Sequence, residues 1–293
     1  MIVLRNLILI AANPFRDTDY QTSRAIYTML SQAGHSCSIC PVFSDDLTVP
    51  ELSGFRASKM ESVSQEARLA IVLGGDGTIL YAADLLRGMD VPIAGVNLGG
   101  KGFLTAMEAA ETDRLLRIAA GEYTLSRRMM LDVELIRNGE AIFRQSVLND
   151  VVVHGANAEC IGILAKCNDL PMTHFSGDGI IVATPTGSTA YSMSAGGPIV
   201  EPNNENIIVT PICPHTMAAK SYVLLPTRTV LIEPERIHDR RAILSADGNE
   251  AIPLISGDQI RVKRSERSVL LAETGTTSFF DRAFEKLSGY REG

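Results

Sequence analysis

The chain has 293 residues, of which 45% are hydrophobic and 21% are charged, and its formal net charge is −7. This balance is typical of a folded globular protein, and the length fits two domains of ordinary size. The negative charge argues against nucleic acid and anionic membranes as partners, because both require a basic surface. A phosphate-bearing small molecule is still compatible, since a few backbone N–H groups can bind a phosphate.

The first apolar run follows Asn6 and is six residues long, too short to cross a bilayer. No other stretch approaches eighteen apolar residues, so we expect a cytoplasmic protein without a signal peptide. Five cysteines, an odd number, argue against a disulfide framework. Cys37 and Cys40 have C-x-x-C spacing, but no second ligand pair follows. Ordinary thiols in or beside a strand are therefore favoured over a zinc or redox site.

Strand-like and helix-like segments alternate over the first 120 residues. The short apolar runs that predict buried strands lie at 7–11, 36–43, 69–73 and 92–96. The segments with helical apolar spacing, each closed by a glycine, lie at 20–33, 78–87 and 108–120. This alternation predicts a doubly wound α/β domain, with a mostly parallel sheet covered by helices on both faces.

After about residue 125 the sequence becomes rich in β-formers and nearly loses its helical patterns. Segments 129–137 and 140–147 flank Asn138-Gly139, and this dipeptide between strands predicts a hairpin. Further short strands are expected near 151–154, 161–166, 180–184, 206–210, 229–233, 242–246, 259–264 and 268–272. The second half is therefore predicted to be an all-β, sandwich-like domain.

The expected domain boundaries follow from this change of pattern. We expect an α/β domain over 1–125, a β-sandwich domain over 126–275, and a C-terminal helix over 276–293 that returns to the first domain. Large apolar residues recur at i, i+4 and i+7 in this tail: Phe280, Phe284 and Leu287. The spacing predicts an amphipathic helix that packs on the body of the protein.

The run Gly74-Gly75-Asp76-Gly77-Thr78 joins a predicted buried strand to a predicted helix. Glycine lets a ligand approach the backbone, and the N–H groups of a helix start favour an anion. We therefore expect Gly74, Gly75, Gly77 and Thr78 to bind a phosphate. A carboxylate would repel that phosphate unless Asp76 accepts a hydroxyl hydrogen or holds a metal. The alternative is a tight turn in which Asp76 caps the helix. The run is not a Walker P-loop.

Two other segments suit a nucleoside. The glycine-rich loop 95–104 contains Phe103, which could face a base or ribose; alternatively, the loop only connects elements and Phe103 lies in the core. The side chains of Asn149 and Asp150 could clasp the two vicinal hydroxyls of a ribose, and the alternative is a polar bulge between strands.

The segment from Gly177 to Pro198 combines small residues and hydroxyls with a single aromatic residue, Tyr191. Small side chains let the backbone touch a ligand. Tyr191 could stack on a base, and Thr189, Ser192 and Ser194 could supply polar contacts. The alternative is a low-complexity surface loop.

Together these runs resemble the NAD kinase family. The resemblance rests, in family order, on Gly74–Thr78, Asn149-Asp150, Gly177–Pro198 and Pro214-His215-Thr216, with a weaker echo at Asp247-Gly248-Asn249. The Gly-Gly-Asp-Gly-Thr run is shared with 6-phosphofructokinases and diacylglycerol kinases. The Thr-Pro-Thr-Gly-Ser-Thr-Ala-Tyr run is much more specific to NAD kinases.

The resemblance implies transfer of the γ-phosphoryl group of ATP to the adenosine-ribose 2′-hydroxyl of NAD, giving NADP. It implies that Asp76 orients and deprotonates that hydroxyl, that Mg²⁺ or another divalent metal takes part, and that the protein is a homodimer or homotetramer. The NAD-binding residues predicted in this way are Asp76, Gly77, Phe103, Asn149, Asp150, Asp178, Thr189, Ala190, Tyr191, Ser192, Met193, Ser194 and Asn249.

Some positions depart from the family pattern. Cys160 stands where His is frequent, Ser176 where Arg is frequent, and Asn249 where Gln is common. The sequence of the loop after Asn97 also differs from the family pattern, at Leu98, Gly100 and Lys101. Two rival functions are a lipid or sugar kinase that shares the Asp76 motif and a nucleotide-binding sensor without turnover.

Overall fold

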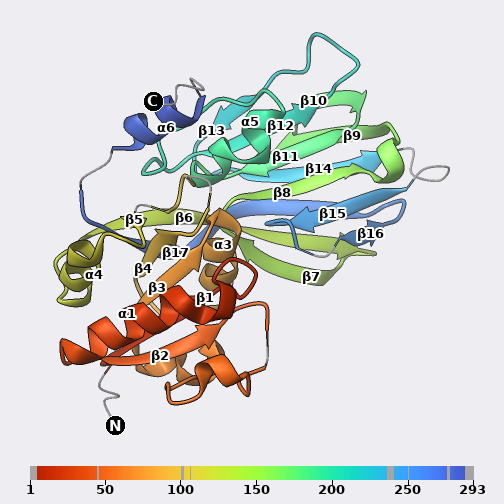
Figure 1. Ribbon diagram of the computed structural model, residues 1–293. Helices are drawn as coiled ribbons and strands as arrows, with labels where there is room; N and C mark the ends of the chain where they lie inside the picture. Colours follow the sequence, from red (N-terminus) through yellow and green to blue (C-terminus); the bar gives the residue numbers. More distant parts are fainter. Residues whose placement is uncertain are drawn as a thin grey trace. The chain divides into compact units, whose positions relative to one another are not determined.

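The computed structural model describes residues 5–44, 46–99, 102–105, 107–235, 241–249, 251–275 and 278–287 (Figure 1). The chain divides into two compact units: Met1–Arg127 with Val269–Gly293 form unit 1, and Arg128–Ser268 form unit 2. Each unit has its own buried apolar cluster. Among the described helices, none is long and apolar enough to span a membrane.

Unit 1 is built on a parallel sheet in the order β2-β1-β3-β4. The end of β17 lies beside β4, with Leu271 opposite Ile93, and the short β5 pairs with the end of β4. The strands are β1 (Leu7–Ala12), β2 (Ser36–Pro41), β3 (Ala67–Gly74), β4 (Ile93–Asn97), β5 (Met107–Glu108) and β17 (Gln259–Glu273). Their apolar runs are buried on both faces, as in other parallel sheets.

Helices cover both faces of this sheet. Ile26 and Leu30 of α1 and Leu115 of α4 join one apolar cluster with Ile8 and other sheet residues. On the opposite face lies α3, which packs so closely that a side chain at Gly95 would meet Ile79 of that helix. The helices are α1 (Gln21–Gln32), α2 (Met60–Val63), α3 (Asp76–Leu85) and α4 (Thr112–Ala119), with 3₁₀ turns η1 (Thr18–Tyr20), η2 (Pro50–Leu52) and η3 (Ser64–Glu66).

Unit 2 contains two antiparallel layers. One has the order β10-β9-β14-β17, with the β6–β7 hairpin paired to β17, and the other has the order β13-β12-β11-β8-β15-β16. Its elements are β6 (Thr124–Arg137), β7 (Glu140–Val147), β8 (Asp150–Gly155), η4 (Ala156–Ala158), β9 (Ile161–Cys167), β10 (Leu170–Gly177), β11 (Gly179–Ala183), η5 (Thr186–Thr189), α5 (Tyr191–Ser194), β12 (Ile207–Ile212), β13 (Tyr222–Leu224), β14 (Thr229–Glu235), β15 (Ala242–Ala246) and β16 (Ile252–Leu254).

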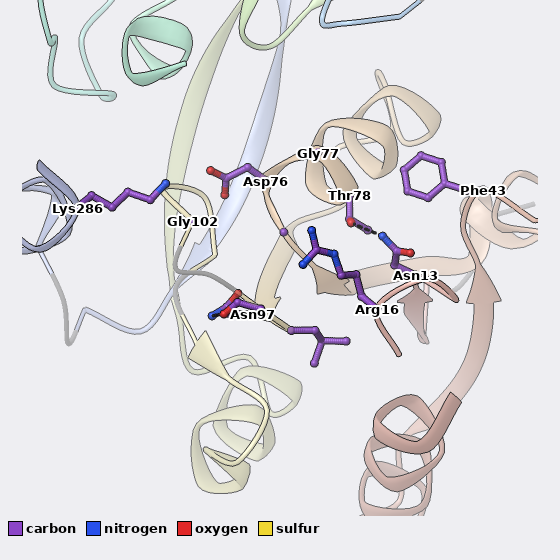
Figure 2. Close-up of a pocket in the computed structure, with 12 residues that line it drawn as sticks. Asn13, Arg16, Phe43, Asp76, Gly77, Thr78, Asn97, Gly102 and Lys286 are labelled. Carbon is purple, nitrogen blue, oxygen red and sulfur yellow. Dashed lines mark hydrogen bonds between the residues drawn. The ribbon is translucent and has the colours of Figure 1, made fainter. Parts of the chain in front are cut away.

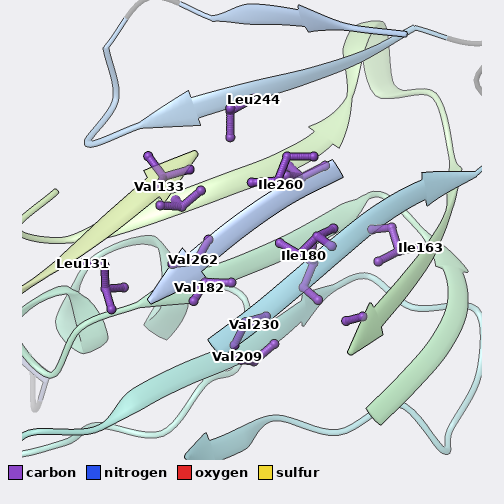
Figure 3. Close-up of a cluster of buried hydrophobic side chains, with 14 of the residues drawn as sticks. Leu131, Val133, Ile163, Ile180, Val182, Val209, Val230, Leu244, Ile260 and Val262 are labelled. Carbon is purple, nitrogen blue, oxygen red and sulfur yellow. The ribbon is translucent and has the colours of Figure 1, made fainter. Parts of the chain in front are cut away.

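The core of unit 2 follows the two-residue period of its strands. Alternate residues such as Ile180 and Val182 of β11 and Val230 of β14 are fully buried in one cluster, and Figure 3 shows these side chains gathered between the strands. Antiparallel layers joined by such a core are the sandwich expected from the sequence. The predicted fold class is therefore confirmed for both halves.

Some predicted elements differ from the observed ones. The helix expected over 108–120 begins only at Thr112, because Met107–Glu108 pairs with β4. The two strands expected at 259–264 and 268–272 are one continuous strand, β17. Besides β5, three strands were not predicted: β10, β13 and β16. In β10, Pro171 and a mostly exposed side-chain row hide the apolar alternation, which is typical of an edge strand.

The tail forms a helix as predicted, α6 (Phe279–Leu287). Its expected packing face is wrong, however, because Phe280, Phe284 and Leu287 are 65%, 66% and 49% exposed. A different side of the helix makes the contact instead. The Phe279 and Phe103 ring centroids are 6.5 Å apart, and the Lys286 ammonium lies 4.3 Å from the centre of the Phe103 ring. The cation over the aromatic face is an attractive arrangement.

The thiols of Cys37 and Cys40 lie in β2, where both are buried. Burial raises the pKa of Cys37 to about 11 and that of Cys40 to about 12. Both thiols are therefore protonated at neutral pH, which makes them poor nucleophiles and poor metal ligands.

Candidate active site

The turn between β3 and α3 places the start of a helix at the edge of the parallel sheet. Gly75 is the N-cap residue and has no side chain to bond the first turn, so the first N–H groups of α3, those of Asp76 and Gly77, have no partner within the helix. Gly74 has no room for a side chain, because a Cβ there would collide with the Thr78 hydroxyl. The glycines thus let the strand run directly into the helix.

The Asp76 carboxylate is held by the backbone of another loop. Its Oδ2 accepts the N–H of Phe103 at 2.9 Å, and its Oδ1 accepts the N–H of Leu104 at 3.0 Å. The interpretation of Asp76 as the cap of α3 is therefore wrong. Gly102 makes this approach possible, since a Cβ there would collide with Asp76 Oδ1. Each carboxylate oxygen keeps a lone pair for a further donor.

Asn97 ends β4 beside this loop and is only 6% exposed. Its Nδ2 donates to the carbonyl oxygen of Gly99 at 2.9 Å and to Glu108 Oε1 at 3.1 Å. Its Oδ1 has no hydrogen-bond partner among the described residues. Gly100 and Lys101, which also belong to the predicted glycine-rich loop, lie outside the described residues.

The loop after β1 supplies a cation. Asn13 Nδ2 donates to Thr78 Oγ1 at 2.9 Å, and Asn13 Oδ1 accepts the Phe15 N–H at 3.0 Å, which ties this loop to α3. The exposed Arg16 follows, and its Nη1 would lie 2.7 Å from a Cβ on Gly99. Over the part of the chain that the structure describes, the Arg16 guanidinium makes no hydrogen bond or ion pair.

These groups line a cavity of about 470 Å³, whose walls are Asn13, Arg16, Phe43, Gly75, Asp76, Gly77, Thr78, Asn97, Leu98, Gly99, Gly102 and Lys286. Figure 2 shows the Arg16 and Lys286 side chains reaching toward the space beside Asp76. The cavity lies at the carboxyl ends of the neighbouring strands β1 and β3. From β1 the chain continues to β2 on one side of this pair, and from β3 it continues to β4 on the other side. Ligands bind at such a switch point in open α/β sheets.

Sequence reasoning did not find Asn13, Arg16, Phe43 and Lys286. The first three follow the carboxyl ends of β1 and β2, which meet the end of β3 at one edge of a parallel sheet. That proximity was a usable signal. Lys286 had none, because the approach of α6 to Phe103 is a tertiary contact.

In unit 2 the predicted Asn149 and Asp150 are organised by Asp247. The Asp247 carboxylate accepts the N–H groups of Leu148, Asn149 and Asp150 at 2.6, 2.7 and 3.1 Å. Burial of Asp150, together with the nearby Asp247 charge, raises the pKa of Asp150 to about 7. Asn249 lies in the same turn as Asp247, where its N–H donates to the carbonyl oxygen of Ala246. The structure therefore brings Asn149, Asp150 and Asn249 together.

The stretch that leads into the predicted segment 189–194 lies beside Asn149. The Thr184 N–H donates to the Asn149 carbonyl oxygen at 2.9 Å, and Gly187 packs against the Asn149 backbone. Tyr191 is 45% exposed, and Thr189, Ala190, Met193 and Ser194 are half-buried or exposed. Ser192 differs: it is fully buried, and its hydroxyl lies 3.0 Å from Thr210 Oγ1. In this conformation a ligand can meet Tyr191 but not the Ser192 hydroxyl.

Asp178 lies apart from this group. In the antiparallel β8–β11 pair, Ala183 faces Asp150 and Gly179 faces His154, so Asp178 and Asp150 are at opposite ends. A hydrogen bond to Asp178 raises the pKa of the neighbouring Cys213 thiol.

Two of the departures from the family pattern, Cys160 and Ser176, lie at the same end as Asp178. The His215 N–H donates to the Ser176 carbonyl oxygen at 2.8 Å, and Cys160 Sγ lies 3.8 Å from His215 Nδ1. Cys160 and Ser176 are thus clustered around His215, whereas Asn249 lies in the turn with Asp247.

Comparison with known proteins agrees with the resemblance in the sequence. The family model for the ATP-NAD kinase N-terminal domain matches residues 8–123, and that for the ATP-NAD kinase C-terminal domain matches residues 148–274. The NAD kinase of Symbiobacterium thermophilum is 39% identical over 273 residues, which cover 92% of this chain and 94% of that protein. The NAD kinase of Caldanaerobacter subterraneus subsp. tengcongensis is 36% identical over 275 residues, covering 93% and 95%.

Two solved structures share the fold. The yeast NADH kinase complexed with NADH superposes with a TM-score of 0.81 at 24% identity, covering 98% of this chain and 89% of that one. An NAD kinase from Archaeoglobus fulgidus in complex with ATP superposes with a TM-score of 0.72, also at 24% identity, covering 97% of each chain. Both domain models and the nearly full-length relatives lead to one conclusion: the chain belongs to the NAD kinase family of enzymes.

Proposed function

We propose that the protein transfers the γ-phosphoryl group of ATP to the adenosine-ribose 2′-hydroxyl of NAD, giving NADP and ADP. The observation that carries this proposal is the Asp76 carboxylate, held at the start of α3 by two backbone N–H groups in a cavity with two cationic side chains. Relatives named NAD kinase, one of them 42% identical over 221 residues, support the choice of substrates.

Asp76 has the role of orienting and deprotonating the acceptor hydroxyl. The 2′-hydroxyl donates a hydrogen bond to the carboxylate, the new O–P bond forms as the bond to ADP breaks, and the proton passes to Asp76. Because the transition state of phosphoryl transfer is loose, the carboxylate accepts the proton late. A positioned base of this kind contributes about 10²- to 10⁴-fold to the rate.

The phosphates meet positive groups in the same cavity. The N–H groups of Asp76 and Gly77 and the positive end of the α3 dipole favour an anion. Arg16 and Lys286 add full charges on the cavity wall. These groups offset the negative charge that the Asp76 carboxylate brings close to the phosphates.

The cavity residues also fit a divalent metal that arrives with ATP. The described residues hold no cluster of three His, Cys, Asp or Glu side chains suited to a metal. Mg²⁺ needs none, since it is usually held by substrate phosphates, water and one or two oxygen ligands. Asp76 and the unpartnered Oδ1 of Asn97 would supply those ligands. When bound, the metal neutralises phosphate charge.

For NAD, we assign a binding role to the group in unit 2 around Asn149 and Asp150. The amide and the carboxyl suit vicinal ribose hydroxyls, and the exposed Tyr191 ring suits stacking on a base. With its pKa raised to about 7, Asp150 can either donate or accept a hydrogen bond near neutral pH.

We also infer a homo-oligomer, as a homodimer or homotetramer. Support comes from the edge strand β13, where Val223 is 51% exposed, from Leu225, which directly follows the strand and is 58% exposed, and from Met217, which is 87% exposed. An unpaired strand edge with exposed apolar side chains is suited to a protein interface.

The function is tested by incubating the protein with NAD, ATP and Mg²⁺ and detecting NADP with an NADP-specific dehydrogenase. Asp76→Asn is expected to keep NAD binding and to lose nearly all turnover, because the amide cannot accept the proton. The matched control is Asp84→Asn on the same helix, whose carboxylate pairs with Arg87 and does not line the cavity.

Three results would contradict the proposal. Turnover near wild type in Asp76→Asn would remove Asp76 as the base. NAD binding without any NADP would favour a sensor, and no NAD binding at all would favour a lipid or sugar acceptor.

A further inference from the structure

A second cavity, of about 300 Å³, lies in unit 1 next to the Asp76 cavity. The two cavities share one wall residue, Phe43, which follows β2. The second cavity is bounded further by Tyr81 and Leu85 of α3 and by Met60 and Glu61 of α2. Nothing in the proposed phosphoryl transfer at Asp76 uses this space.

Phe43 is held in an unusual conformation at the boundary between the cavities. Its φ of 62° lies in the left-handed region, which is unfavourable for a bulky side chain. The strain is held by the neighbouring backbone, since the Val42 N–H donates to the Ala12 carbonyl oxygen of β1 at 2.9 Å. Strained residues of this kind cluster at ligand sites.

The Phe43 ring is available to a ligand. It is 43% exposed, although its centroid lies 4.3 Å from that of Tyr81, at an interplanar angle of 45°. In Figure 2 the ring lies beside α3, with Thr78 between it and Asp76. The flat, apolar face of the Phe43 ring therefore borders the Asp76 cavity, on the far side of Thr78 from the Asp76 carboxylate.

We propose, building on the proposed function, that the second cavity binds the purine base of ATP and that the Phe43 ring stacks on it. The ribose and the phosphates separate the base from the γ-phosphoryl group, so the base must bind outside the space beside Asp76. Aromatic side chains stack on every base, and Phe43 together with Tyr81 provides such a surface where the two cavities meet.

The test compares a donor that has a base with one that lacks it. Affinities for the non-hydrolysable analogue AMP-PNP and for tripolyphosphate, both with Mg²⁺, are measured by calorimetry. Phe43→Ala is expected to weaken AMP-PNP binding by about 10- to 100-fold. Binding of tripolyphosphate and of NAD is expected to stay unchanged, and Phe43→Trp is expected to bind AMP-PNP as wild type does.

Two further variants keep the result interpretable. Phe280→Ala removes a more exposed ring that lines neither cavity, and its affinities should match wild type. Tyr81→Leu removes the other ring of the same stacking surface, the one that α3 contributes. It should also weaken the binding of AMP-PNP more than the binding of tripolyphosphate. Melting temperatures near wild type establish that the variants are folded.

Three outcomes overturn the proposal. Unchanged AMP-PNP affinity in Phe43→Ala places the base elsewhere. An equal loss of affinity for AMP-PNP and for tripolyphosphate means that Phe43 affects the Asp76 cavity and not the base. A loss of affinity for NAD alone means that the surface binds the acceptor. Since binding is measured without turnover, these results are separate from a failure of wild type to form NADP.

Discussion

At the scale of single residues, Asp150 is a carboxyl group whose surroundings disfavour its ionised form. Burial and the neighbouring Asp247 raise its pKa from 3.8 to about 7. The folded state therefore favours the protonated form more than the unfolded chain does. This relative stabilisation is complete below the unfolded pKa and is lost as the pH rises through about 7.

We accordingly predict that the free energy of unfolding falls between pH 4 and pH 7, by on the order of a few kcal/mol from this group. Thermal melting in a pH series measures it. Asp150→Asn should flatten this slope, because the amide does not titrate. Asp169→Asn, at an exposed turn between β9 and β10, is the matched control and should keep the wild-type slope. A wild-type slope in Asp150→Asn would show that other groups cause the pH dependence.

For single residues, the sequence predicted the motifs that are contiguous in the chain, and it missed the contacts between residues that are distant in the chain. The importance of Asp76 follows from a glycine-rich turn that is contiguous in the chain. The hydrogen bonds that fix its carboxylate come from the N–H groups of Phe103 and Leu104, which lie 27 and 28 residues further along the chain. The same applies to Ser192: its hydroxyl looks available in the sequence, but in the fold it is buried against Thr210.

At the scale of elements, periodicity predicted which segments fold but not what they contact. The spacing in α6 correctly indicates a helix with one apolar face, yet that face is exposed and the contact to Phe103 comes from Phe279 and Lys286. In β17 the polar residues 263–267 break the apolar alternation, so one strand was predicted as two. The strand is nevertheless continuous, and it pairs with β14 at residues 260–263 and with β6.

The position of Lys286 makes α6 part of the wall of the Asp76 cavity. We predict that Lys286→Ala raises the KM for ATP by about 5- to 10-fold, the size expected for losing one partly exposed charge near a triphosphate, and leaves the KM for NAD unchanged. Steady-state kinetics measure both values. Lys263→Ala, an exposed lysine of unit 2, is the control and should leave both values as in wild type. An unchanged KM for ATP in Lys286→Ala would mean that the ammonium serves only the contact with Phe103.

At the scale of the whole molecule, the exposed apolar residues at the edge of unit 2 have no counterpart in the described chain that covers them. Because β13 ends its sheet, a second copy can pair with its free edge and bury Val223, Leu225 and Met217. A lysine at such an edge opposes pairing, since its charge would be buried. We therefore predict that Val223→Lys lowers the molar mass measured by light scattering at micromolar concentration.

Ile142→Lys provides the comparison, since Ile142 is an equally exposed apolar residue, 50% exposed on β7 and distant in sequence from β13. It should leave the molar mass at the wild-type value if the effect belongs to β13. Equal losses in both variants would indicate a general effect of added charge, and a monomeric wild type would refute the oligomer itself. If the mass falls only in Val223→Lys, the NADP assay on that variant separates assembly from catalysis, because every cavity residue around Asp76 is unchanged in it.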